Sequence, residues 1–115
     1  MAVYKEHLQQ PFFDDIKRGA KKFEGRLVKK IWAQLQIGDS IEWWNNEKGY
    51  EESFVSVVTS LTKFVTFAEG IESVGLINVL PSHSNMTIKE AIDTVYRRWY
   101  SEVGEKEYGV ILVGL

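Results

Sequence analysis

Residues 19–26 of this chain, with the sequence Gly-Ala-Lys-Lys-Phe-Glu-Gly-Arg, combine charged groups that could do chemistry. The carboxylate of Glu24 stands between Lys21 and Lys22 on one side and Arg26 on the other. Alternation along a strand would put Lys22, Glu24 and Arg26 on one face. The carboxylate can neutralise these cations, or hold them ready for an anionic or carbonyl-bearing ligand. The sequence leaves both interpretations open: a ligand site, or an ion cluster that only closes the fold.

Two of these residues could also be catalytic. A lysine against a desolvating wall can have its pKa lowered enough to act as a base, whereas a nearby carboxylate raises that pKa again. If Lys21 and Glu24 pair, Lys21 is a cation that binds or polarises, and Glu24 is the better base. We therefore predict Lys21 and Glu24 as catalytic residues, and Lys21, Lys22 and Arg26 as ligand-binding residues.

The charge of the chain is uneven and favours a phosphate-bearing ligand. The first thirty residues carry eight basic and four acidic side chains, a local charge of +4, although the whole chain has a net charge of -2. A basic patch on an acidic protein suits local capture of a phosphate-bearing ligand better than non-specific wrapping of long duplex DNA.

Aromatic residues provide a second indication, because single-stranded nucleic acid binding usually pairs cations with stacking platforms. Tyr96 and Tyr100 are one helical turn apart, so we expect their hydroxyls to reach the rim of a cleft and predict both as ligand-binding residues. Trp99 lies in an apolar helical stripe and is expected in the core. Alternation places only one of Trp43 and Trp44 in the core and does not say which.

The composition excludes several functional classes. At 115 residues we expect one domain, residues 1–115, and the absence of cysteine excludes disulfides, thiolate catalysis and cysteine-ligated zinc. His7 and His83 lack metal-ligand spacing, so no metal or cofactor is expected, and His83 is placed at the surface. No apolar run approaches the roughly 20 residues of a membrane span, and the N-terminus has no signal-peptide centre. We expect a soluble, cytoplasmic protein with no membrane partner; nothing in the sequence indicates an oligomeric state.

The predicted elements define a mixed fold. We expect strands at 3–8, 22–27, 40–45, 50–61 and 107–113, the fourth long and bent and the last buried on both faces. Helices are expected at 11–19, at 87–99 behind a capping box of Thr87 and Glu90, and as two short pieces in 64–80 broken at Gly70, with Gly75 as a further candidate break. A hairpin turn at 46–49 interrupts strand–helix alternation. These elements predict an α+β fold with a small curved sheet or barrel and helices on its open side.

The chain resembles the ASCH domain family, which belongs to the PUA-like group of small β-barrels, and within it the small archaeal-type members. Residues 19–26 are similar to the family signature G-x-K-x-x-E-G-R. The resemblance covers nearly the whole chain, because three further segments match in order: Gly-Asp-Ser-Ile at 38–41, Asn-Val-Leu-Pro at 78–81, and Tyr-Arg-Arg-Trp-Tyr at 96–100 followed by Tyr-Gly-Val at 108–110.

This resemblance implies a barrel with a cleft beside it, lined by Lys21, Glu24 and Arg26, that accepts RNA or a nucleoside. Some relatives are amidohydrolases that remove the acetyl group from acetylated cytidine with a lysine, a threonine and a glutamate. Lys21 matches the lysine, but Glu24 stands in place of the threonine and Ser84 in place of the glutamate. We therefore expect an RNA- or nucleotide-binding domain. The alternatives are a hydrolase of RNA or a modified nucleoside that uses Lys21 and Glu24, and an adaptor whose groove binds a peptide.

Overall fold

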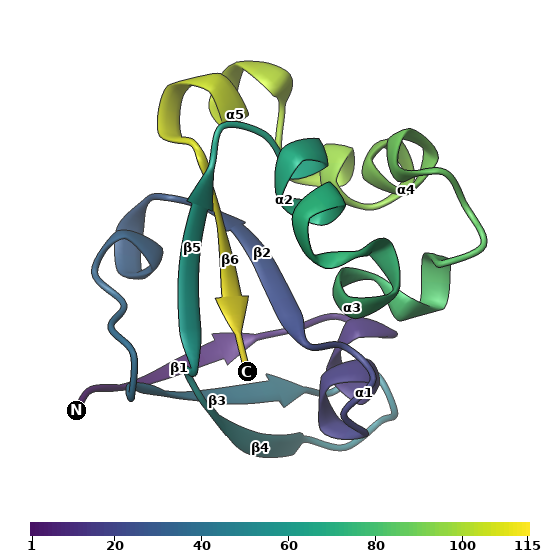
Figure 1. The fold of residues 1–115 in the computed structure, drawn as a ribbon. Coiled ribbons are helices and arrows are strands. Elements are labelled where there is room, and N and C mark those ends of the chain that lie inside the picture. The colour runs from purple at the N-terminus through teal and green to yellow at the C-terminus, as the bar shows by residue number, and fades with distance from the viewer.

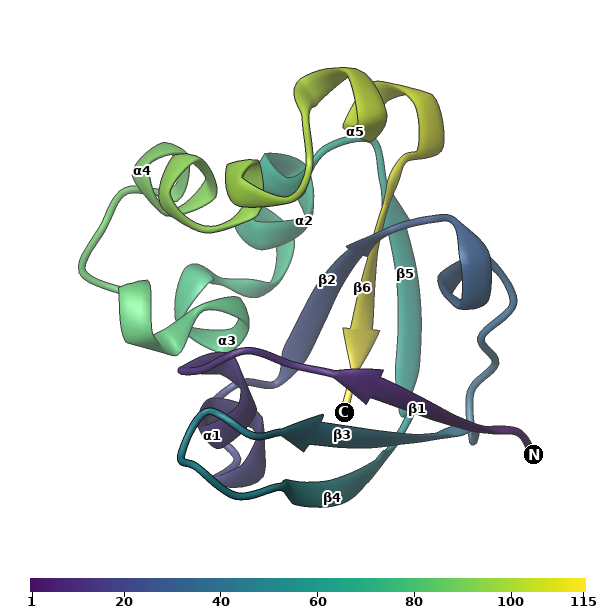
Figure 2. The ribbon, with the colours of Figure 1, turned by 180° about the vertical axis from the view of Figure 1, so that it is seen from behind.

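The computed structural model describes residues 1–115 and contains two three-stranded sheets whose strands cross at a steep angle (Figures 1 and 2). The α+β prediction is confirmed. Neither sheet closes on itself, so the structure shows no closed barrel. The first sheet has the order β1 (Val3–His7), β3 (Ser40–Asn45), β4 (Glu52–Val57), and the second has the order β2 (Phe23–Leu27), β6 (Val110–Gly114), β5 (Ser60–Phe64).

The predicted long strand at 50–61 is wrong, because it forms two strands that belong to different sheets. The chain leaves β4 at Val57 and enters β5 at Ser60. Backbone hydrogen bonds fix both sides of this corner: Val58 donates to Asp39 at 2.8 Å, and Thr59 donates to Gly114 at 2.9 Å. Val58 is buried at this corner, so the apolar pattern of the sequence continues through it. The pairing partner nevertheless changes, from β3 for β4 to β6 for β5.

Helices gather beside the second sheet, where α2 packs on β5 and β6 and α3 packs on β2 (Figures 1 and 2). The predicted break at Gly70 is wrong, since Gly70 lies inside α2. The break is at Gly75, where φ is +95° and glycine is the favoured residue. The helices are α1 (Phe12–Lys17), α2 (Phe67–Val74), α3 (Leu76–Val79), α4 (Ile88–Thr94) and α5 (Glu102–Tyr108).

The predicted helix at 87–99 begins correctly and ends early. The capping box of Thr87 and Glu90 is present, but α4 ends at Thr94 and the chain turns through a 3-10 segment, Tyr96–Arg98. The stacking of Tyr96 on Phe67, with ring centres 4.1 Å apart, accompanies this change of direction. Trp99 is consequently 45% exposed, and its prediction as a core residue is wrong.

The C-terminal strand is buried along its whole length, as its apolar run predicted. It begins at Val110, and the preceding residues form α5, which we did not predict because that segment is charged and has no apolar stripe. In the first sheet Trp43 is fully buried, while Trp44 is half-buried and meets His7 edge-on. None of the helices is long and apolar enough to cross a membrane.

Candidate functional site

A cavity of about 230 Å³ lies between the end of β1, the edge of β2 and the turn that follows α4. We call it the aromatic cavity, because four aromatic side chains form much of its wall. Strand β2 contributes its central residues to the opposite side. The lining includes the aromatic residues Phe12, Tyr96, Trp99 and Tyr100, together with Glu24, Gly25 and Arg26 of β2.

The turn between α1 and β2 directs Lys21 into the protein. Gly19 has a φ of +80°, which lets the chain reverse after the helix. The carbonyl oxygen of Asp15 then accepts hydrogen bonds from the backbone N–H groups of Ala20 and Lys21, at 3.0 and 2.9 Å. Asp15 is itself buried, and its carboxylate accepts a hydrogen bond from the Ser82 hydroxyl at 2.6 Å.

The Lys21 side chain is completely buried and lies behind the cavity wall. Its Nζ donates to the carbonyl oxygen of Val79 and lies 3.4 Å from Oε1 of Glu24. Burial lowers the pKa of Lys21, and the nearby Glu24 carboxylate opposes that change. Lys21 itself does not line the cavity, whereas its ion-pair partner Glu24 does.

Glu24 is the centre of the charged cluster. Its Oε2 accepts hydrogen bonds from Nε and Nη2 of Arg26, at 3.1 and 2.9 Å, while Oε1 faces Lys21. Burial acts to raise the pKa of Glu24, but the charges of Arg26 and Lys21 outweigh burial and lower it. Glu24 is therefore an ionised carboxylate with both oxygens engaged by cations, which favours a positioning role over proton abstraction.

Arg26 pairs with Glu24 and packs against two tryptophans. Its guanidinium carbon lies 4.6 Å from the ring centre of Trp32 and 6.0 Å from that of Trp43. A planar guanidinium stacks well on an indole face, and such stacking orients its donors. Burial acts to lower the pKa of Arg26, but Glu24 outweighs it and the pKa is raised. Nη1 forms no bond with Glu24, and the guanidinium also interacts with the Tyr100 hydroxyl.

Tyr96 presents a buried hydroxyl that donates no hydrogen bond and whose oxygen lies against the backbone of Gly25. The residue is 3% exposed, and its ring is stacked on Phe67, with the planes inclined by 9°. Burial, followed by the charge of Glu24, raises the pKa of Tyr96 well above its usual value. The hydroxyl therefore keeps its proton. An unpaired buried donor beside a cavity is a position where a ligand acceptor would be stabilised.

The backbone of Gly25 also faces this side. The ladder between β2 and β6 continues at both ends through bonds from Leu115 to the Lys22 carbonyl and from Val28 to the Gly109 carbonyl. Residues of an antiparallel edge strand bond to their neighbour alternately, so the N–H and C=O of Gly25 point away from β6. They lie on the side of β2 that the Tyr96 hydroxyl and the cavity occupy.

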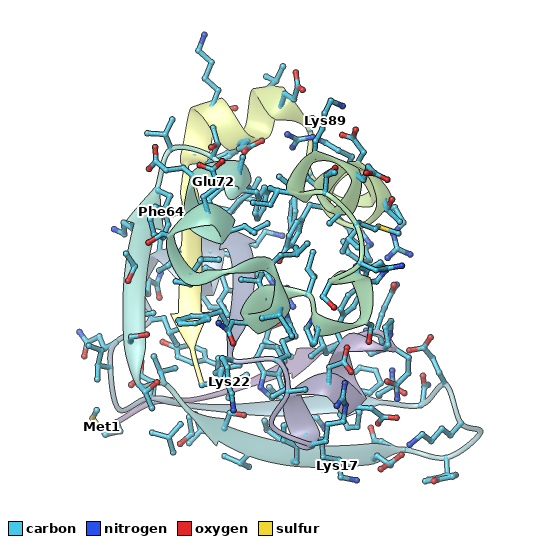
Figure 3. The ribbon with its side chains drawn as sticks, turned by 45° about the vertical axis from the view of Figure 1, so that its right-hand side comes forward. Met1, Lys17, Lys22, Phe64, Glu72 and Lys89 are labelled. Atoms are coloured by element: carbon cyan, nitrogen blue, oxygen red, sulfur yellow. The ribbon has the colours of Figure 1, made fainter.

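Four of the six predicted site residues line the aromatic cavity, and two do not. Glu24, Arg26, Tyr96 and Tyr100 line the aromatic cavity. Lys21 joins the cluster from behind, whereas Lys22 is exposed at the surface (Figure 3) and does not line the aromatic cavity. The basic patch of the first thirty residues is also largely neutralised. Five of its eight basic side chains form ion pairs: Lys5, Lys17, Arg18, Lys21 and Arg26.

Sequence reasoning missed two aromatic residues of the cavity. Phe12 and Trp99 meet edge-on with ring centres 6.2 Å apart, and Arg98 lies 4.5 Å from the Trp99 ring centre. Trp99 could have been assigned to the cavity only if the end of α4 at Thr94 had been predicted, and the apolar spacing continues past that residue. His83 also differs from its prediction as a surface residue: it is half-buried and stacked on Phe12 at 6.0 Å, and burial, aided by Arg98, lowers its pKa.

The structure thus defines a small α+β protein with a charged cluster and an aromatic cavity at a sheet edge. Two solved structures resemble it. Hypothetical protein PH0355, solved by crystallography, is 32% identical with a TM-score of 0.83, and the match covers 97% of this chain and 95% of that chain. Protein PF0455 from Pyrococcus furiosus, solved by NMR, is 37% identical with a TM-score of 0.76, covering 97% and 94%.

At these identities and coverages, the chain belongs to the same family as PH0355 and PF0455. No family model and no curated protein matches the sequence. Nowhere in the structure do three histidine, cysteine or acidic side chains gather closely enough to hold a metal ion.

Proposed function

We propose that the protein binds a base of single-stranded RNA, or of a free nucleotide, in the aromatic cavity. The observation that carries the proposal is the combination of an aromatic wall with unpaired polar groups facing the same space. Trp99 and Tyr100 provide ring faces, and Tyr96 provides a buried donor without a partner. The sequence resemblance to ASCH domains supports the proposal. We also propose that the protein is an ASCH domain of the PUA-like group.

The size and chemistry of the cavity agree with a single base. Pockets for drug-sized ligands measure about 300–1,000 Å³. The aromatic cavity, at about 230 Å³, is smaller, and favours one planar group over a folded oligonucleotide. Stacking of a base on an aromatic side chain contributes about 1–3 kcal/mol, and the backbone groups of Gly25 with the Tyr96 hydroxyl can hydrogen-bond a base edge.

Chemical-shift mapping tests this proposal directly. Cytidine, uridine, adenosine and guanosine, and then short single-stranded RNAs, would be titrated into isotopically labelled protein. We expect the amide of Gly25 and the indole N–H of Trp99 to shift together and to saturate. Shifts confined to the hairpin at 46–49 or to the outer strand β4, or no shift with any nucleoside or RNA, would refute the proposal.

A hydrolase of RNA or a modified nucleoside is the second candidate, and one observation favours it. Lys21 lies 3.4 Å from Oε1 of Glu24, which lines the aromatic cavity, and burial lowers the pKa of Lys21; a lysine with a lowered pKa is a better base or nucleophile than an ordinary one. Acylated nucleosides and single-stranded RNA would be incubated with the protein and with a Lys21→Met variant. Product formation that the variant loses would support catalysis, whereas equal background in both would count against it.

A further inference from the structure

A second cavity, of about 290 Å³, adjoins the aromatic cavity across two shared residues, Arg26 and Tyr100. We call it the basic cavity, because Arg26, Lys29 and Lys30 line it, with Glu6 as its one carboxylate. We propose that the basic cavity binds a phosphate group of the same nucleotide whose base enters the aromatic cavity. This inference rests on the proposed function and adds the chemical class of its ligand: a phosphorylated nucleotide in preference to a free nucleoside.

The charge of the basic cavity supports a phosphate ligand. Of the three basic side chains in the first thirty residues that form no ion pair, two, Lys29 and Lys30, line this cavity. The third, Lys22, lies elsewhere. Lys29 extends over the ring of Tyr108, with its Nζ 5.1 Å from the ring centre, which holds the amine without neutralising it.

Arg26 links the two cavities chemically. Nε and Nη2 are bound to Glu24, so Nη1 is the nitrogen that a second anionic partner would bond, next to the Tyr100 hydroxyl that Arg26 also contacts. Glu6 opposes an anion here, yet it is one carboxylate against Lys29, Lys30 and the guanidinium. Charge-assisted hydrogen bonds from guanidinium and ammonium groups to phosphate are among the stronger polar interactions in proteins.

The backbone at Lys30 carries a second, independent signal. Its φ is +54°, and it is the one residue other than glycine with a positive φ in the structure. A lysine in this conformation costs about 1–2 kcal/mol that glycine would avoid. Such conformations are retained at sites where the side chain has a role, and here the lysine is placed beside Lys29 at the basic cavity.

Calorimetric titration with four ligands tests the inference: a nucleoside, its 5′-monophosphate, its 3′-monophosphate and inorganic phosphate. One monophosphate should bind at least about tenfold more tightly than the nucleoside, since a charged hydrogen bond of ordinary strength gives such a factor. A Lys29→Ala/Lys30→Gly variant should lose this advantage and keep its affinity for the nucleoside. The glycine also removes the positive-φ strain at residue 30, and retained affinity for the nucleoside would show that the variant is folded.

A matched variant, Lys22→Ala/Lys63→Ala, removes two exposed cations that line neither cavity. It should retain the phosphate advantage, and an equal loss in both variants would overturn the inference in favour of general charge attraction. Equal affinity for nucleoside and both monophosphates would overturn the inference while leaving the proposed function intact. Inorganic phosphate that binds as tightly as the nucleotide would reveal an independent anion site and also overturn it. If no nucleoside or nucleotide binds, both proposals fail.

Discussion

The Tyr96 hydroxyl occupies the space beside Gly25 that any other side chain would need. A Cβ atom added to Gly25 would lie 2.7 Å from the hydroxyl oxygen of Tyr96 and 3.2 Å from its Cζ. The ring cannot move away easily, because Phe67 is stacked against it at 4.1 Å. The second glycine of the motif is therefore required by a tyrosine more than seventy positions later in the chain.

The first prediction concerns this contact. Gly25→Ala should destabilise the protein by about 1–3 kcal/mol, the usual cost of overpacking a well-filled site. Adding Tyr96→Phe should recover most of the loss, since the nearest atom is then removed. Urea unfolding of both single variants and the double variant measures the coupling. Additive effects of the two substitutions would show that the contact is not the cause.

The second prediction separates stability from binding at Tyr96. Tyr96→Phe alone removes a buried hydroxyl that donates to no acceptor, and a buried donor of this kind costs about 1–3 kcal/mol. The variant should therefore be as stable as the parent protein or more stable, yet bind nucleosides more weakly. Thermal unfolding and nucleoside titration on the same samples check both halves. A clear loss of stability would mean that the hydroxyl has a partner within the protein.

The third prediction orders the members of the charged cluster. Glu24→Gln leaves Lys21 and Arg26 as buried cations without their carboxylate, and breaking a buried pair in this way costs about 3–5 kcal/mol. Lys21→Met should cost less, about 1–3 kcal/mol, because Glu24 keeps Arg26 as a partner on Oε2, although Oε1 and the Val79 carbonyl both lose Lys21. Urea unfolding provides the comparison, and the reverse order would contradict this account of the cluster.

The fourth prediction is a pH dependence with a definite sign. The pKa of Glu24 is lowered from its ordinary value of 4.5, so below pH 4.5 the unfolded chain takes up a proton before the folded protein does. Stability therefore falls as the pH is lowered from 4.5 through the folded pKa. Glu24→Gln should flatten this acid limb of the stability curve. A variant whose stability falls as steeply as that of the parent would exclude Glu24 as the source.

Much of the fold followed from local signals. Glycine turns, the capping box at Thr87 and the apolar run of β6 predicted elements that the structure contains. The exchange between sheets at Val58 did not follow, because its cause is pairing with Asp39 and Gly114, which lie far away in the sequence. The end of α4 was hidden for a similar reason, since it coincides with the stacking of Tyr96 on Phe67.

The charged residues of the site were predicted, but their arrangement was not. Lys21, Glu24 and Arg26 do form the ion cluster that was one of the two interpretations. Glu24 and Arg26 also line the aromatic cavity. The same residues can therefore form an ion cluster with Lys21 and present a wall to a ligand. Trp99 could not be assigned to that cavity from helical spacing, because its position depends on the turn after Thr94.

The most direct test of the central claim is the affinity of a Trp99→Ala variant for the best-binding nucleoside. Trp99 is 45% exposed, so its removal should leave the fold intact and remove a stacking interaction of about 1–3 kcal/mol, a loss of roughly tenfold in affinity. The matched control is Tyr50→Ala, which removes an aromatic residue that is 60% exposed and lines neither cavity. Weaker binding is expected for Trp99→Ala alone; equal affinity of both variants and the parent protein would exclude a base stacked on Trp99.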